Sequence, residues 1–248
     1  MAYWGYVKSI KNFIKNINEH RVPSVLEIGV DKGQTFVPLL SYLTNNCEKF
    51  TLYGIDIKIQ SSLQVMLELM TEDLAGEDEI HDLKMFRRSS LEILPELFEH
   101  MKNHGESGLF DVILIDGDHN YYTVEKEIRY CASLLRNGGV IVVDDYSGNG
   151  ENENEYFSEI SGYENNELAT KREETEIEGK VGVRQAIDDF LKENDEWAIT
   201  DALAPGFEPR LLYRRGEQTF YESHTGKAVN LEKDSLTLSH HDKGIFVE

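Results

Sequence analysis

The sequence has few of the residues that build thiolate or disulfide frameworks. Its 248 residues include two cysteines, Cys47 and Cys131, and neither belongs to a CxxC pair or a cysteine–histidine cluster. Disulfide frameworks and structural zinc sites need such paired spacings. The sequence therefore indicates neither a disulfide framework nor a zinc site. We expect both thiols to lie in or near the core.

Positive charge is also scarce. Lysine and arginine together number 25 against 46 aspartates and glutamates, which gives a formal net charge of -21. This balance argues against a nucleic-acid backbone or an anionic membrane as the main partner, so a small-molecule partner is favoured. The sequence does not decide whether the chain forms a homo-oligomer.

Long apolar runs are missing as well. No stretch approaches the about 18 consecutive apolar residues of a membrane span, and the first residues contain no continuous apolar signal segment. We therefore expect a soluble, cytoplasmic protein.

What the sequence does contain is an alternation of short apolar runs with segments of helical periodicity. Hydrophobic residues make up 40% of the chain, which fits one globular domain. The alternation predicts an α/β, three-layer sandwich around a mainly parallel sheet, closed by an antiparallel pair. The expected strands are 25–30, 52–57, 83–87, 112–115, 140–143, 197–203 and 210–213, and the expected helices are 6–17, 36–43, 61–74, 91–104, 121–135 and 182–192.

Two segments fall outside this alternation. Residues 147–180 are rich in Glu, Asn, Ser and Gly with little periodicity, which is typical of a lid or a disordered insertion. Residues 217–248 alternate weakly and are expected to form a β-rich extension of the domain that spans residues 1–216. Pro95 conflicts with an early start of the helix at 91–104, since proline disrupts helix interiors.

The first glycine turn follows the strand at 25–30. Glu27-x-Gly29-x-x-x-Gly33 lets the backbone approach a ligand, but Asp31 and Gln34 stand where a dinucleotide fingerprint needs glycine. A pyrophosphate is therefore disfavoured. Glu27 suits a ligand that carries an amino group.

The ends of the next two strands carry further polar residues. Asp56 is placed to accept hydrogen bonds from both hydroxyls of a ribose. Ser89 and Ser90 follow the third strand, at the same edge of the predicted sheet. Taken with the glycine turn, these residues predict a nucleoside site.

A second cluster is acidic. Asp116 follows the strand at 112–115, and Asp144 and Asp145 follow the strand at 140–143. Three hard oxygen ligands at neighbouring strand ends favour Mg²⁺, with Mn²⁺ or Ca²⁺ as substitutes. Solvated strand ends or a helix cap are the competing explanation for Asp144 and Asp145.

Taken in order, the motifs resemble those of class I S-adenosylmethionine-dependent methyltransferases over residues 23–213. The matching stretches are E-x-G-x-x-x-G-x-T, the acid Asp56, DVILIDGDH and GGVIVVDDY. IDGDHNY, VVDDY and GVRQAIDDF resemble the metal-dependent O-methyltransferases that act on macrolide and aminocoumarin sugars and, more distantly, the catechol enzymes. Val183 departs from the cysteine that is commoner at its place.

The resemblance implies a Rossmann-like sheet of seven strands with an antiparallel last strand. It implies that Gly29, Gly33 and Thr35 lie beside the methionine portion of the cofactor, that Asp56 binds its ribose, and that Ser90, with Ser89, lies near its adenine. Asp116 is expected to bind both cofactor and metal.

A base is needed because a hydroxyl is a poor nucleophile until it loses its proton. His119 is favoured, since its ordinary pKa of about 6.5 suits a base at neutral pH; Asp118 is the alternative, as is a role for His119 as a helix cap or metal ligand. The hypothesis is an Mg²⁺-dependent S-adenosylmethionine O-methyltransferase acting on a small-molecule hydroxyl, with a sugar or glycoside preferred. A catechol-type phenol methyltransferase, a non-catalytic cofactor-binding module and a dehydrogenase are the rivals, the last disfavoured by the glycine spacing.

Overall fold

The computed structural model describes residues 3–18, 21–74, 81–146, 154–200, 210–215, 219–222, 228–230 and 245–247. A seven-stranded sheet with the order β3-β2-β1-β4-β5-β7-β6 forms its centre. Its strands are β1 (Ser24–Ile28), β2 (Phe50–Ile55), β3 (His81–Phe86), β4 (Phe110–Ile115), β5 (Leu135–Val143), β6 (Trp197–Thr200) and β7 (Arg210–Arg214).

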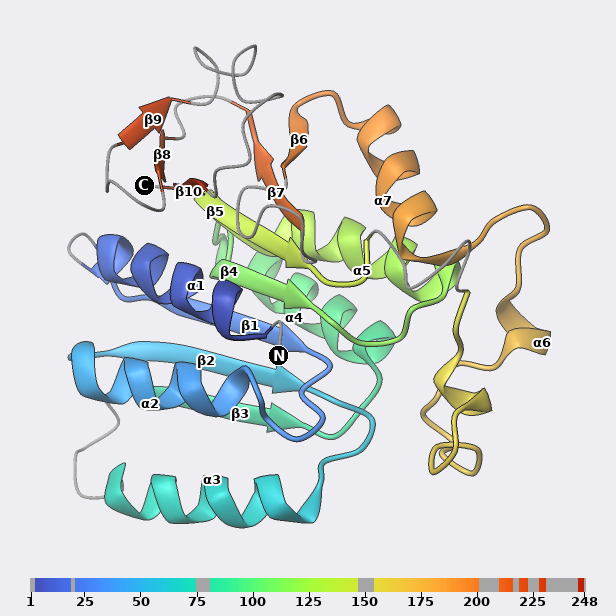
Figure 1. Ribbon diagram of the computed structural model, residues 1–248, viewed down its shortest axis with the longest axis horizontal. Coiled ribbons are helices and arrows are strands. Elements are labelled where there is room, and N and C mark those ends of the chain that lie inside the picture. The colour runs from blue at the N-terminus through green and yellow to red at the C-terminus, as the bar shows by residue number, and fades with distance from the viewer. Residues whose placement is uncertain are drawn as a thin grey trace.

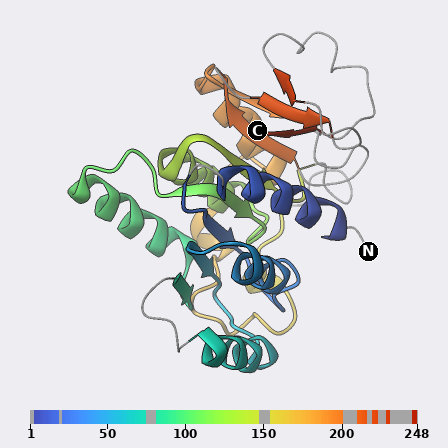
Figure 2. The same ribbon diagram turned by 90° about the vertical axis from the view of Figure 1, so that its left-hand side faces the viewer.

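Helices cover both faces of this sheet (Figures 1 and 2). They are α1 (Tyr3–Asn18), α2 (Phe36–Asn46), α3 (Ser61–Leu74), α4 (Ser90–His104), α5 (Tyr121–Leu134), α6 (Arg172–Thr175) and α7 (Gly182–Glu193). α1, α2 and α3 contribute to one hydrophobic core, while α4, α5 and α7 contribute to the other. None of the helices in the described ranges combines the length and the apolar character needed to cross a bilayer.

β4 shows why the two cores form. Val112 and Leu114 are buried in the core beneath α1 and α2, and Ile113 and Ile115 are buried in the core beneath α4 and α5. Successive side chains of a strand point to opposite faces, so a continuous apolar run serves both layers.

β7 pairs antiparallel with both β5 and β6, while the pairs among β1 to β5 are parallel. The predicted three-layer, Rossmann-like fold with a mainly parallel seven-stranded sheet is therefore confirmed. The predicted antiparallel strand corresponds to β7, which lies between β5 and β6 in the sheet.

Most elements differ from their predicted bounds by a few residues, and two of these differences have a clear physical cause. β5 begins at Leu135, well before the predicted 140, because Leu135 pairs with Phe110 across an irregularity in the β4–β5 register. α4 begins at Ser90 and continues through Pro95. The Ser89 hydroxyl accepts a hydrogen bond from the backbone N–H of Leu91 (3.3 Å) and so caps this helix.

One acid anchors the amino-terminal edge of the sheet. Asp111, at the start of β4, is fully buried and accepts a hydrogen bond from the backbone N–H of Ser24 (2.9 Å). It pairs with Arg21, and Nη1 of Arg136 lies 3.1 Å from its Oδ2. Burial raises the pKa of Asp111, and the two guanidinium groups oppose that rise.

Residues 154–180, called the strap from here on, lie beyond the arrowheads of β1, β2 and β4 in Figure 1. They contain the short 3₁₀ helix η1 (Phe157–Glu159) and α6. The carboxamide oxygen of Asn154 accepts hydrogen bonds from the backbone N–H groups of Tyr121 (2.8 Å) and Gly182 (3.0 Å). Lys58 donates to the Gly162 carbonyl (2.9 Å), which ties an inner part of the strap to the loop after β2.

The remaining predictions concern segments that are only partly described. Residues 147–153 of the expected insertion and most of residues 217–248 lie outside the described residues. Within the tail, β8 (Thr219–Glu222), β9 (Ala228–Asn230) and β10 (Ile245–Val247) form a separate antiparallel sheet. The domain boundary at 216 and the role of 147–180 as a lid stay predictions.

Candidate functional site

The carboxyl ends of the parallel strands enclose two neighbouring cavities beneath the strap. The larger, called the acidic cavity, has a volume of about 290 Å³, and its lining includes Glu27, Asp31, Asp56, Asp116, His119 and Asp145. The smaller, called the serine cavity, has a volume of about 40 Å³, and its lining includes Ser89, Ser90, Asp118, Thr123, Glu127 and Leu168. Gly29, Asp56 and Phe157 line both cavities.

The turn after β1 has left-handed backbone at Gly29 (φ 83°), Asp31 (φ 45°) and Gly33 (φ 77°). A Cβ on Gly29 would lie 1.8 Å from the carbonyl oxygen of Asp116, which follows the neighbouring strand. The close packing of β1 against β4 therefore requires a glycine at this position, independently of any approach by a ligand. Thr35, just before α2, is buried and lines the acidic cavity.

Asp56 holds that turn in place. Its Oδ2 accepts hydrogen bonds from the backbone N–H groups of Val30 (2.8 Å) and Asp31 (2.8 Å), and its Oδ1 accepts one from Lys58 (2.7 Å). Burial raises the pKa of Asp56, and these hydrogen bonds oppose the rise. Because a carboxylate has about four acceptor positions, one remains for a ligand.

Glu27 is an unsatisfied acid at the inner end of the acidic cavity. It projects from β1, is 2% exposed, and its Oε2 has no hydrogen-bond partner among the described residues. Burial, followed by repulsion from Asp116 and Asp56, raises its pKa well above the usual range. A cationic or amino ligand would relieve both costs, because it adds a donor and opposes the negative charge.

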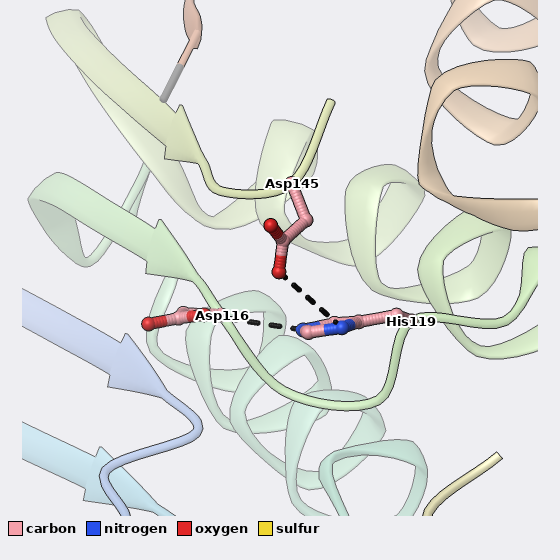
Figure 3. Close-up of side chains that lie close together, drawn as sticks. All are labelled: Asp116, His119 and Asp145. Atoms are coloured by element: carbon pink, nitrogen blue, oxygen red, sulfur yellow. Dashed lines mark ion pairs between the residues drawn. The ribbon is translucent and has the colours of Figure 1, made fainter. Parts of the chain in front are cut away.

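Three side chains converge at the rim formed by β4 and β5 (Figure 3). One ligand atom each from Asp116, His119 and Asp145 lies within 4.8 Å of the other two. Asp145 is itself held in left-handed backbone (φ 51°). Such a convergence of carboxylate oxygens and one imidazole nitrogen suits a divalent cation.

The predicted ligand Asp144 lies outside this group of three. Its Oδ1 accepts a hydrogen bond from the backbone N–H of Asp145 (3.0 Å). Burial, followed by repulsion from Asp144, Asp145 and Asp31, raises the pKa of Asp116 well above the usual range. The carboxylates therefore fit a bound cation, which would remove the repulsion.

The two nitrogens of His119 have different surroundings. Nδ1 lies 3.3 Å from Oδ2 of Asp145 and 3.7 Å from Oε2 of Glu155 in the strap. Nε2 is buried and has no hydrogen-bond partner among the described residues, with Asp116 Oδ1 at 3.9 Å. Nδ1 is thus oriented by two acids, and Nε2 is available to a ligand.

Asp118, the alternative base, is already engaged. Its Oδ1 accepts a hydrogen bond from the backbone N–H of Phe157 (2.9 Å), and its Oδ2 accepts one from the Thr123 hydroxyl (3.3 Å). Burial raises its pKa, and the Phe157 hydrogen bond opposes the rise. In this arrangement Asp118 holds the strap against the start of α5.

Sequence reasoning missed Glu127. This α5 residue is 1% exposed, and its Oε1 accepts a hydrogen bond from the Ser90 hydroxyl (2.6 Å). A signal was present, since Glu127 lies on the same helical face as the apolar Val124, Ile128 and Cys131. An acid on a buried helical face is unusual enough to mark a site.

A family model described as a methyltransferase domain matches residues 26–146. These residues run from within β1 to just beyond β5, so they include the ends of β1, β2, β3 and β4 that line the two cavities. The comparison with curated proteins found no match.

Among solved structures, the chain is similar to apo CalS11, a TDP-rhamnose 3'-O-methyltransferase of calicheamicin biosynthesis. The two share 12% identity over 85% of this chain and 78% of that one, with a TM-score of 0.55. MycE, a methyltransferase of the mycinamycin pathway in complex with Mg and SAH, shares 18% identity over 56% of this chain, with a TM-score of 0.39. The matched region covers 31% of the MycE chain. The likeness to CalS11 is one of fold.

Proposed function

We propose that this chain, which carries a methyltransferase domain at residues 26–146, is an S-adenosylmethionine-dependent O-methyltransferase of small-molecule hydroxyls. A sugar or glycoside acceptor is preferred, and Mg²⁺ is the proposed metal, with Mn²⁺ or Ca²⁺ as substitutes. The observation that carries the proposal is the pair of His119 nitrogens: Nδ1 lies beside Asp145, and Nε2 faces the acidic cavity with no hydrogen-bond partner in the described part of the chain.

The methyl donor is proposed to occupy the ends of β1, β2 and β3. Glu27, with its unpartnered Oε2, would accept a hydrogen bond from the amino group of the methionine portion. Asp56 would use its remaining acceptor position for the ribose, and Gly29, Gly33 and Thr35 would line the methionine path. Ser89 and Ser90 would lie beside the adenine, as both line the serine cavity.

The metal is proposed to bind Asp116 and Asp145, with Asp144 as the third carboxylate of the rim. When bound, S-adenosylmethionine supplies the methyl group, and the cation supplies positive charge that favours loss of the acceptor's proton. Burial raises the pKa of Asp116 and repulsion from the neighbouring acids raises it further, which supports a cation at this place.

His119 is the proposed base. With its Nδ1 facing Asp145, a proton on Nδ1 is favoured, so Nε2 is left to accept the proton of the acceptor hydroxyl. Asp145 and Glu155 would stabilise the imidazolium that results. The hydrogen bonds that Asp118 accepts from Phe157 of the strap and from Thr123 of α5 make it the weaker candidate.

The strap supplies a further wall of the cavity beside His119. Phe157 meets the His119 ring edge-on, with 5.7 Å between the ring centroids. A closed strap would exclude water, which competes with the acceptor for the methyl group.

The proposal is tested with purified protein, S-adenosylmethionine and a panel of nucleotide sugars, glycosides and catechols, by measuring S-adenosylhomocysteine formation. Turnover of a sugar hydroxyl that EDTA abolishes and Mg²⁺ restores is expected. Turnover of catechols alone would move the assignment to phenols, and turnover unaffected by EDTA would contradict the metal.

Variants at His119 separate its roles. His119→Ala is expected to reduce kcat by about 10² to 10⁴, while the affinities for S-adenosylhomocysteine and Mg²⁺ stay within a few-fold. Loss of Mg²⁺ affinity would make His119 a ligand instead. Tyr122→Phe, at an aromatic residue on the first turn of α5, is the matched control and should leave kcat unchanged. Cofactor binding without turnover of any acceptor would favour a non-catalytic binding module.

A further inference from the structure

Glu127 is a buried acid with one oxygen unused. Its side chain lines the serine cavity and is 1% exposed. Oε1 accepts the hydrogen bond from Ser90, whereas Oε2 has no hydrogen-bond partner among the described residues. Leaving a buried polar atom unpaired is unfavourable, so an unpartnered oxygen beside a cavity indicates a missing ligand.

Among the residues that the structure describes, none places a positive charge against this acid. From α4 the facing group is the neutral hydroxyl of Ser90, and from the β4–α5 loop it is the acidic Asp118. On α5 itself, Cys131 interacts with Glu127. Arg88 also lines the serine cavity, but its guanidinium is paired with Glu92 and Glu96.

Burial therefore sets the protonation state of Glu127. It raises the pKa of Glu127 to about 8; the Ser90 hydrogen bond opposes the rise, and Asp118 adds to it. At pH 7 the carboxyl group is mostly neutral and carries a hydrogen. A neutral carboxyl can donate a hydrogen bond, which an ionised one cannot.

The rest of the serine cavity suits a flat heterocycle. Ile28, Ile57, Phe157 and Leu168 supply apolar walls. Purine rings present acceptor nitrogens in their plane, and a neutral acid at the edge of the ring matches one of them. The volume of about 40 Å³ holds only a few water molecules, so a base would enter with an outward shift of the strap residues.

We propose that Glu127 recognises the adenine of the methyl donor by donating a hydrogen bond from Oε2 to a ring nitrogen, with Ser90 fixing the carboxyl group. Glu127 is thus a positioning and specificity residue for the cofactor. The inference rests on the proposed function, since it requires that the chain bind S-adenosylmethionine.

The test is calorimetric binding of S-adenosylhomocysteine to wild type, Glu127→Gln and Glu127→Ala between pH 6.5 and 8.5. Glutamine keeps a donor without titrating, so Glu127→Gln should bind within about threefold of wild type at pH 6.5. Glu127→Ala should bind at least about tenfold more weakly, the loss of one buried hydrogen bond. Glu125→Gln, at a half-buried acid of the same helix that is paired with Arg129, is the matched control.

The pH profile distinguishes recognition from packing. Wild type should bind about fourfold more weakly at pH 8.5 than at pH 6.5, because a group with a pKa of about 8 is about three-quarters ionised there. Glu127→Gln should lack this decline, while Glu125→Gln should keep it. The ligand's own amino group titrates equally in every variant and cancels in the comparison.

The outcomes distinguish the role of Glu127 from the proposed function of the chain. If wild type fails to bind S-adenosylhomocysteine, the proposed function falls. If wild type binds but Glu127→Gln shows the same decline with pH, or folded Glu127→Ala binds as tightly as wild type, the role of Glu127 falls and the function stands. Thermal unfolding of each variant shows that it is folded, and Glu127→Gln carries the test if the alanine variant is not.

Discussion

Asp111 and Asp116 lie at opposite ends of the β4 region and have opposite surroundings. Asp111 is paired with Arg21 and Arg136 and hydrogen-bonded to the Ser24 backbone. Burial raises the pKa of Asp116, and the neighbouring Asp144, Asp145 and Asp31 raise it further. One end of the sheet neutralises its acid, and the other gathers like charges.

The difference separates folding from function. The charge of a buried acid paired with two arginines is balanced by the chain itself, so Asp111 ties the segment between α1 and β1 to β4 and β5 at the amino-terminal edge. A group of uncompensated acids destabilises the ligand-free chain, and is tolerated where a ligand supplies the missing charge. Variants at Asp116, Asp111 and Glu27 test this contrast.

Asp116→Asn should reduce kcat by at least about 10³, which corresponds to about 4 kcal/mol of transition-state stabilisation. The same variant should unfold at an equal or higher temperature than wild type in EDTA, because a repulsive charge has been removed. Turnover rates with saturating Mg²⁺ and thermal unfolding provide the two measurements. A kcat within tenfold of wild type would remove Asp116 from the site.

Asp111→Asn should show the reverse pattern. Breaking a buried ion pair costs about 3–5 kcal/mol, and we expect about 3 kcal/mol here because both arginines are partly exposed. Urea unfolding measures the loss, and kcat of the folded fraction should stay within twofold of wild type. A variant as stable as wild type would mean that Asp111 is not an anchor.

Adding Mg²⁺ to the metal-free protein should raise its unfolding free energy. At a concentration one hundred times the Kd the expected gain is about 2.7 kcal/mol, because the cation binds only the folded state. Thermal unfolding with Mg²⁺ or EDTA measures it. Asp111→Asn should keep the gain and Asp116→Asn should lose it; equal gains in both would place the cation elsewhere.

Glu27 adds a pH-dependent test at the acidic end. Its folded pKa lies well above its unfolded value of about 4.3, so the folded state binds the extra proton. The unfolding free energy of the ligand-free protein should fall as pH rises from about 4.3 towards the folded pKa, by at most about 1.4 kcal/mol per unit.

Glu27→Gln should remove this component of the slope. Urea unfolding in EDTA at pH 5, 6.5 and 8 gives the comparison, with Glu99→Gln as a control at an exposed acid paired with Lys102. Identical slopes for wild type and Glu27→Gln would show that Glu27 is not held protonated.

Much of the fold could be predicted because the buried apolar residues of helices and strands recur at characteristic spacings in the sequence. α3 has the predicted bounds, 61–74, and the apolar run at 112–115 lies within β4. β5 was predicted too short, since Arg136, Asn137 and two glycines hide a strand whose register is set by its partner β4.

The site was less predictable, because its geometry depends on contacts without a sequence period. Asp116 and Asp145 lie close together because they follow neighbouring strands of the sheet. The predicted alternation of strands and helices already implied that these strand ends would be neighbours. The position of His119 depends on a loop, and the strap is held by single polar contacts such as that of Asn154 with Tyr121. Glu127 could not be assigned to the site from the strand pattern, because it projects from a face of α5 and not from a strand end.

Phe157 forms a wall of both cavities while its backbone N–H is held by Asp118. A ligand that displaces this residue from one cavity reshapes the other. Donor and acceptor affinities are then linked, and any factor by which the donor changes acceptor binding equals the factor by which the acceptor changes donor binding. Saturation curves for either substrate should therefore depend on the concentration of the other.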